Sequence, residues 1–259
     1  MSFSEIKIEH GDVSATVSPS RGGLVTGLKV NGKDVLYLDR ASFDDPTKNV
    51  RGGVPILFPY AGKLVDGVFT HAGTKMGQHG FGRNKEWRVS EQGKTLLRYT
   101  LGHDNETIMQ YPYDCIAEQT VMIVPRGLQI ELLICNTGNK TMPVSPGWHP
   151  YFCCPANDKN KVSSDVPGLK SDALTIDKEF DFGLVAPQTG RAKFNIPNLG
   201  KLLISFSPRM RHMQFWSQPG KDFICLEPFT GPNNTVNTDK RVDIPPGEAR
   251  NFWMRIELE

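Results

Sequence analysis

Hydrophobic and polar residues alternate along much of the chain, whereas helical periodicity is rare. No window of about a dozen residues carries a sustained 3.6-residue apolar stripe between clear helix caps. Short segments with a period of two recur instead, which is the pattern of strands with one buried face. The segments that we expect to form strands are residues 5–9, 14–18, 95–101, 118–124, 128–136, 202–206, 213–216, 223–226 and 252–258.

The clearest pair of strands is 118–124 and 128–136, with Pro125, Arg126 and Gly127 between them. Proline is suited to enter a tight turn and Gly127 to leave it with a positive φ, so we predict a hairpin. Clusters of Gly, Pro, Asn and Asp separate the alternating segments, which indicates antiparallel sheets packed face to face. We therefore expect an all-β fold, a large antiparallel sandwich with few short helices, forming one domain over 1–259.

The composition supports a strand-and-turn fold and argues against nucleic acid and membranes as partners. The 259 residues include 25 glycines and 19 prolines, an excess over the roughly 12% of average usage that fits many turns. The 30 basic and 28 acidic residues nearly balance, which argues against nucleic acid as a partner. No apolar run approaches the roughly 18 residues of a membrane helix. The five cysteines show no disulfide spacing. We expect a cytoplasmic monomer or homodimer without a membrane partner.

Four segments combine turn residues with side chains that a folded core does not need. Residues 49–63 carry Arg51 and Lys63 around a short apolar run, a pattern that a buried strand with solvated ends explains equally well. Residues 77–87 carry His79 and Arg83 next to glycines, which let a backbone approach a ligand closely. A structural histidine is the alternative there.

The other two segments carry an imidazole and a carboxylate. His149 stands between prolines in the aromatic segment 145–152, whose rings could hold a flat ligand such as a sugar or could form a core cluster. Glu227, in segment 222–234, ends an apolar strand and precedes a proline. It is either an exposed charge at a strand end or a carboxylate held partly desolvated for acid–base chemistry.

Other familiar site motifs are missing from the sequence. Cys153 and Cys154 are adjacent and lack the spacing that wraps a tetrahedral metal ion. Nucleotide-binding glycine fingerprints and the serine-hydrolase G-x-S-x-G motif do not occur.

Taken together and in order, these segments resemble the galactose mutarotase (aldose 1-epimerase) family. The stretches that carry the resemblance span nearly the whole chain: Arg51-Gly-Gly-Val-Pro, Phe58-Pro59, His79-Gly-Phe-Gly-Arg83, Tyr111-Pro112-Tyr113, Gly147-Trp-His-Pro-Tyr-Phe152, Cys225-Leu-Glu-Pro228 and Ile244-Pro-Pro-Gly-Glu248. The resemblance implies a β-supersandwich and a cofactor-independent isomerase that interconverts the α and β anomers of an aldose.

The resemblance also implies roles for single residues. His149 corresponds to the general acid and Glu227 to the general base of ring opening. His79 corresponds to a residue that hydrogen-bonds the sugar. Lys63 falls where many family members have arginine, so its place in substrate binding is a departure from the family pattern.

Two alternatives remain open at this point. Arg51 and Arg83 also fit the pattern of the hexose-6-phosphate 1-epimerase branch, in which such arginines bind phosphate. The sequence motif around His149, residues 148–152, is instead more similar to that of epimerases that act on a free aldose. The chain could also be a non-catalytic carbohydrate-binding domain. The presence of both His149 and Glu227 favours catalysis, because a binding module needs no matched acid and base.

Overall fold

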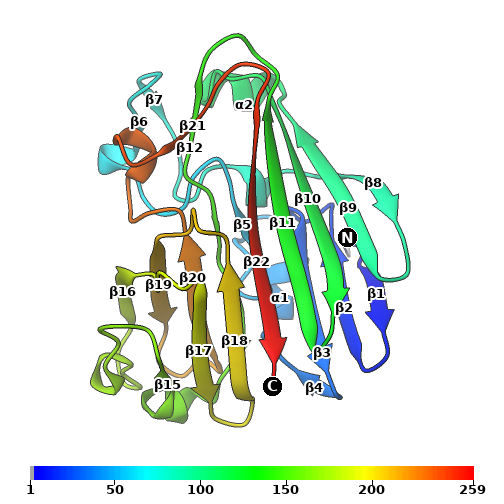
Figure 1. Ribbon diagram of the computed structural model, residues 1–259, viewed down its shortest axis with the longest axis vertical. Helices are drawn as coiled ribbons and strands as arrows, with labels where there is room; N and C mark the ends of the chain where they lie inside the picture. Colours follow the sequence, from blue (N-terminus) through cyan, green and yellow to red (C-terminus); the bar gives the residue numbers. More distant parts are fainter. Residues whose placement is uncertain (1–2) are drawn as a thin grey trace.

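One wide antiparallel sheet forms a full layer of the fold. The structure is a computed structural model that describes residues 3–259. Eight strands lie side by side in one sheet (Figure 1). In spatial order they are β15 (Ser163–Ser164), β17 (Arg191–Ile196), β18 (Gly200–Phe206), β22 (Ala249–Leu258), β11 (Gly127–Asn136), β10 (Cys115–Val124), β9 (Leu96–Gly102) and β8 (Arg88–Gln92).

Two further sheets cover the inner face of this layer. One has the order β1 (Ile6–His10), β2 (Val13–Ser18), β3 (Leu24–Val30) and β4 (Lys33–Asp34). The other contains six strands: β16 (Phe180–Val185), β19 (His212–Ser217), β20 (Phe223–Phe229), β13 (Gly147–Trp148) and β5 (Ile56–Leu57) in that order, with β14 (Tyr151–Cys153) also paired to β20. Isolated bridges such as Val25 to Val54 and Leu36 to Phe152 join the two sheets. The main hydrophobic core lies between these sheets and the eight-stranded layer.

Short elements complete the chain. Two small ribbons pair β12 (Met142–Val144) with β21 (Val242–Ile244) and β6 (Val68–Phe69) with β7 (Thr74–Lys75). The helices are α1 (Arg40–Asp44), α2 (Asn105–Gln110) and the 3₁₀ turns η1 (Val65–Gly67), η2 (Gly82–Asn84), η3 (Ala156–Lys161), η4 (Ser171–Ala173) and η5 (Thr235–Asn237). Within residues 3–259, no helix has the length and apolar character needed to cross a membrane.

The expected all-β sandwich with few short helices is confirmed, and each of the nine expected segments overlaps an observed strand. The turn of the β10–β11 hairpin differs in one detail. Val124 pairs with Gly127, so the turn residues are Pro125 and Arg126, and Arg126 rather than Gly127 has the positive φ of 64°. Glycine is needed at 127 for another reason, because a Cβ there would lie 1.8 Å from the carbonyl oxygen of Ile256 on β22.

A buried glutamine ties the two layers together beneath the six-stranded sheet. Gln119 on β10 is 0% exposed. Its amide nitrogen donates to the Tyr99 hydroxyl and to the carbonyl of Gly23, and its amide oxygen accepts from Trp148 Nε1 at 3.1 Å. Trp148 is the residue before His149, so this contact holds the backbone at the start of the segment that carries His149.

Replacing Gln119 with leucine should destabilise the fold by about 2–4 kcal/mol, because buried partners on Tyr99, Trp148 and Gly23 lose a hydrogen bond without gaining water. Urea unfolding measures this loss. Gln92→Leu, at an exposed strand position, is the matched control and should change the free energy of unfolding by less than about 0.5 kcal/mol. Equal effects of the two substitutions would contradict the assigned role of Gln119.

Candidate active site

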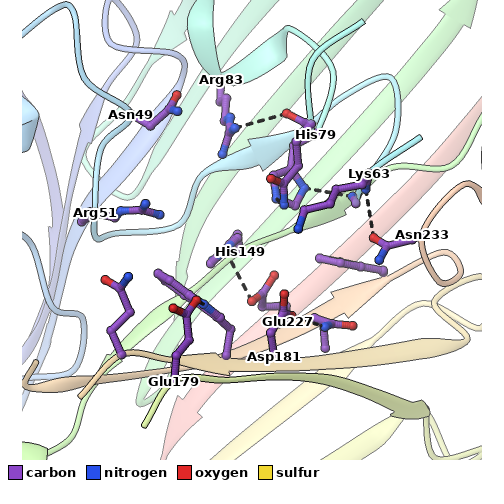
Figure 2. A pocket seen from close by; sticks show the side chains of 16 residues that line it. Asn49, Arg51, Lys63, His79, Arg83, His149, Glu179, Asp181, Glu227 and Asn233 are labelled. Atoms are coloured by element: carbon purple, nitrogen blue, oxygen red, sulfur yellow. Dashed lines mark hydrogen bonds and ion pairs between the residues drawn. The ribbon is translucent and has the colours of Figure 1, made fainter. Parts of the chain in front are cut away.

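One cleft collects residues from all four segments that the sequence singled out. It has a volume of about 210 Å³ and opens beside the six-stranded sheet (Figure 2). The six candidate residues all line it: Arg51, Lys63, His79, Arg83, His149 and Glu227. The fold therefore brings these scattered positions together around one cleft.

Strand alternation puts Glu227 into the cleft. On β20, Ile224 and Leu226 point into the main core, so Cys225 and Glu227 point to the opposite face. Glu227 is nevertheless only 1% exposed. Glu227 is thus a buried carboxyl group that reaches the cleft.

His149 faces Glu227 from the connection between β13 and β14. Its backbone N–H donates to the carbonyl of Pro55 at 3.0 Å, and its ring stacks on Tyr151 with centroids 4.8 Å apart. His149 Nε2 then lies 3.4 Å from Glu227 Oε1, while Nδ1 is buried without a hydrogen-bond partner. The two side chains form a close pair of ionisable groups that Figure 2 shows at the floor of the cleft.

Burial works against charge on both members of this pair. Desolvation raises the pKa of Glu227 well above its ordinary value, the Asp181 carboxylate raises it further, and Arg83 opposes the shift. Desolvation also lowers the pKa of His149, and the positive charges of Arg83 and Arg51 lower it further. The surroundings therefore favour the uncharged form of the pair, with the shared proton on Glu227 rather than on His149.

His79 is held in one tautomer by its own loop. Its backbone N–H donates to the carbonyl of Gly62, and the Gly62 N–H donates to His79 Nδ1 at 2.9 Å. Burial, followed by repulsion from Arg83 and His149, holds the pKa of His79 well below its usual range. The neutral ring must then carry its proton on Nε2. Nε2 lies 3.0 Å from the end of the Gln78 amide, which accepts this proton when its oxygen is turned toward the ring. A φ of 69° at His79 shows that the loop adopts a strained backbone to place this ring.

Three cations line the cleft without a carboxylate partner. Within the described part of the chain, none of Arg51, Lys63 and Arg83 forms an ion pair. The Arg51 guanidinium lies over the Trp216 ring at 5.1 Å. Arg83 donates from Nη2 to the Gln78 carbonyl at 3.2 Å, and its buried Nε has no partner. Figure 2 shows Arg51 and Arg83 on the same side of the cleft, beside Asn49.

The structure adds acidic and amide residues that the sequence interpretation missed. Glu179 accepts from Trp216 Nε1 at 2.7 Å, and Asp181 accepts from the Gln214 side chain at 2.5 Å. Both carboxylates line the cleft. Their signal was the alternation of acidic and aromatic residues over 179–182, which places Glu179 and Asp181 on one face of β16 and its approach.

The sequence left a ligand platform and a core cluster open for the aromatic segment 145–152, and the structure shows the core cluster. Trp148 and Phe152 point into the main core, and Tyr151 is only 2% exposed beneath the His149 ring. The Trp148 and Phe152 rings fill the main core, whereas the Tyr151 ring packs with Trp216 and Phe223 beneath His149. Trp216 and Phe229 are the aromatic residues that line the cleft instead.

A metal ion is poorly suited to the cleft floor. Donor atoms of His149, Cys225 and Glu227 lie within 4.8 Å of one another, the one such group found among residues 3–259. A cation there would face Arg51 and Arg83, which already disfavour a positive charge on His149. We assign no metal to this group.

Comparison with known proteins now decides the family. A family model described as aldose 1-epimerase matches residues 4–176. The chain belongs to the aldose 1-epimerase family. A crystal structure of the Slr1438 protein from Synechocystis sp. PCC 6803 superposes with a TM-score of 0.93 at 31% identity, covering 100% of this chain and 97% of that one.

More distant members of the same fold group extend this relationship. The galactose mutarotase related enzyme from Lactobacillus acidophilus has a TM-score of 0.81 at 17% identity, with 99% of this chain and 97% of that chain covered. A protein from Cenchrus ciliaris, provisionally named glucose-6-phosphate 1-epimerase, is 30% identical over 144 residues. That match spans 51% of this chain and 41% of the relative's length.

Glu227→Gln should stabilise the fold at neutral pH. Above the ordinary carboxyl pKa of 4.5 the unfolded chain loses the Glu227 proton, whereas the folded protein retains it, so this group lowers the free energy of unfolding as pH rises. Glutamine removes that effect and can still donate to His149. Urea unfolding at pH 4 and pH 7.5 should show an advantage of the variant at pH 7.5 that shrinks at pH 4. An identical difference at both pH values would show that Glu227 is not desolvated.

Proposed function

We propose that the protein interconverts the α and β anomers of a hexose, with Glu227 and His149 as the proton-transferring pair. The observation that supports this most strongly is the 3.4 Å contact between two buried, oppositely shifted ionisable groups in the cleft of an aldose 1-epimerase family member. Pairs of titratable groups whose surroundings shift their pKa values apart are characteristic of acid–base sites.

Each group has one role in opening the ring. The Glu227 carboxylate takes the proton from the anomeric hydroxyl while the protonated His149 gives a proton to the ring oxygen. The bond between C1 and the ring oxygen breaks, and C1 becomes an aldehyde. Rotation about the C1–C2 bond exposes the other face, and the ring closes as both protons return. His79, with its proton on Nε2, is suited to donate a hydrogen bond to a sugar oxygen.

Burial changes the relative free energies of the two forms of the Glu227–His149 pair. Before ring opening the pair is Glu227 carboxylate with His149 imidazolium, and after it the pair is uncharged. Both forms contain the same number of protons, so one sugar turnover needs no proton from water. Because the low-dielectric surroundings favour the uncharged form, they stabilise the pair that accompanies the open-chain sugar. In the empty cleft the same surroundings favour protonated Glu227 and neutral His149, so the reacting ion pair forms in the complex with the sugar.

Glu227→Gln and His149→Gln should each lower kcat for anomerisation by about 10²–10⁴-fold, because each removes one positioned acid or base. Polarimetry of freshly dissolved α-glucose and α-glucose 6-phosphate measures the rate. Glu91→Gln and His103→Gln, which change the same residue types at exposed positions, serve as matched controls and should retain the wild-type rate. A folded Glu227 or His149 variant with wild-type kcat would remove that residue from the mechanism.

The unpaired cations favour a phosphorylated hexose as the substrate. Arg51 and Arg83 face one side of the cleft, and the positive charge of Arg51 adds to burial in lowering the pKa of Arg83. Two arginines that repel one another are stabilised by an anion between them, and guanidinium groups bind phosphate through two parallel hydrogen bonds. The sequence motif around His149 favoured a free aldose as the substrate. Because of the two arginines, we propose a hexose 6-phosphate instead.

Arg51→Ala and Arg83→Ala should each lower kcat/KM for glucose 6-phosphate by about ten- to a hundredfold, the loss of one charge-assisted hydrogen bond to phosphate. The values for free glucose and galactose should change much less. Arg88→Ala, at an exposed strand position outside the cleft, is the control. Equal losses for phosphorylated and free sugars would restore the free aldose as the preferred substrate.

A further inference from the structure

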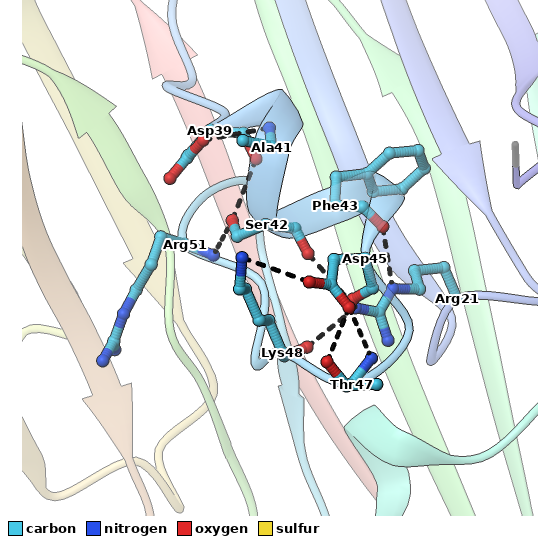
Figure 3. A network of polar contacts seen from close by, with 9 residues as sticks. All are labelled: Arg21, Asp39, Ala41, Ser42, Phe43, Asp45, Thr47, Lys48 and Arg51. Atoms are coloured by element: carbon cyan, nitrogen blue, oxygen red, sulfur yellow. Dashed lines mark hydrogen bonds and ion pairs between the residues drawn. The ribbon is translucent and has the colours of Figure 1, made fainter.

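Arg21 does not line the cleft, but its side chain forms hydrogen bonds with one neighbouring segment, residues 42–48. It lies in the turn between β2 and β3. Arg21 Nε donates to the Phe43 carbonyl at 3.1 Å, and Nη2 donates to the carbonyls of Ser42, Asp45 and Lys48 at 3.2, 2.7 and 2.7 Å (Figure 3). One guanidinium thus holds four carbonyls of residues 42–48.

This segment has little stability of its own. Helix α1 has five residues, far below the length at which an isolated helix is stable, and its last carbonyl groups have no partner within the helix. A turn follows in which Asp45 accepts from the Thr47 N–H and pairs with Lys48 at 3.1 Å. The donors of Arg21 satisfy the carbonyls at the end of α1 and through this turn, which fixes the segment against the sheet.

The same segment holds the backbone of Arg51. The Arg51 N–H donates to Ser42 Oγ at 2.9 Å, and Ser42 Oγ donates in turn to the Asp39 carbonyl. The Asp39 N–H donates to the Arg51 carbonyl at 2.8 Å. Arg51 is therefore tied on both sides of its Cα to residues 39–42. Its side chain extends away from this network (Figure 3) and lines the cleft.

Arg21 is itself held in a fixed orientation. The ring of Phe3 lies 4.8 Å from Arg21 Cζ, and it packs edge-on against Phe43 with centroids 5.8 Å apart. A planar guanidinium has several donors in fixed directions, so it can bind all the carbonyls of this segment at once. A lysine ammonium is a compact charge whose donors do not match this spread of carbonyls. The chain from Arg21 through Ser42 to Arg51 is a continuous set of hydrogen bonds.

We propose that Arg21 is a positioning residue, which sets the place of Arg51 in the cleft through residues 39–51 and thereby controls the preference for a phosphorylated over a free hexose. This inference rests on the proposed function, because it takes Arg51 as a phosphate-binding residue. Arg21 touches no substrate. It acts through the hydrogen bonds that Ser42 and Asp39 make with the Arg51 backbone.

The experiment compares Arg21→Met and Arg21→Lys with Arg98→Met as the matched control. Arg98 also forms several polar contacts, with Glu91, Glu118 and Thr120, but on the eight-stranded sheet outside the cleft. Two quantities are measured on each folded variant. One is amide hydrogen exchange over residues 39–51, and the other is the ratio of kcat/KM for glucose 6-phosphate to kcat/KM for glucose.

Both Arg21 variants should exchange faster over 39–51 and should lower the selectivity ratio about tenfold, mainly through a higher KM for the phosphorylated sugar. Arg98→Met should leave both quantities at wild-type values. If exchange over 39–51 stays at the wild-type level, or if it rises without any fall in the ratio, the positioning role of Arg21 is wrong. A wild-type protein that anomerises neither sugar overturns the proposed function instead, and the exchange data then decide separately whether Arg21 holds the segment.

Discussion

The contact between Glu227 and His149 places two ionisable groups together where each is largely shielded from water. Each group alone would be costly to bury in its charged form, and together they hold one proton that can lie on either side. That single constraint explains the opposite shifts of the two pKa values.

The sheets supply the rigidity, and the loops supply the ligand-facing groups. Glu227 lies within β20, and His149 adjoins β13, both in the six-stranded sheet. Gln119 fixes Trp148 from the opposite layer. The cations, in contrast, come from loops. Arg83 lies in the short 3₁₀ turn η2, and Arg51 lies outside any strand, where its backbone N–H is held by the Ser42 hydroxyl.

Much of the architecture could be predicted from the sequence because strand alternation is a local signal. The strands of seven or more residues, such as β10, β11 and β22, show it clearly. Elements of two or three residues, such as β5, β13 and β14, could not be found in this way, because their pairing depends on partners far along the chain. The roles of His149 and Glu227 were expected from family resemblance and remain proposals, whereas their proximity is a property of the fold. Glu179 and Asp181 were not predicted as cleft residues, because an acidic residue in or beside a strand is usually solvated. They reach the cleft through the pairing of β16 with β19, which is a tertiary contact that no local pattern reveals.

The most direct test of the central claim is nuclear magnetic resonance exchange spectroscopy on α- and β-glucose 6-phosphate with a catalytic amount of the wild-type protein. Our account predicts cross-peaks between the two anomeric proton signals whose intensity grows with protein concentration, because the buried pair opens and closes the sugar ring. Saturable binding of the sugar with an exchange rate equal to that of buffer alone would contradict the account and would identify the cleft as a binding site without turnover.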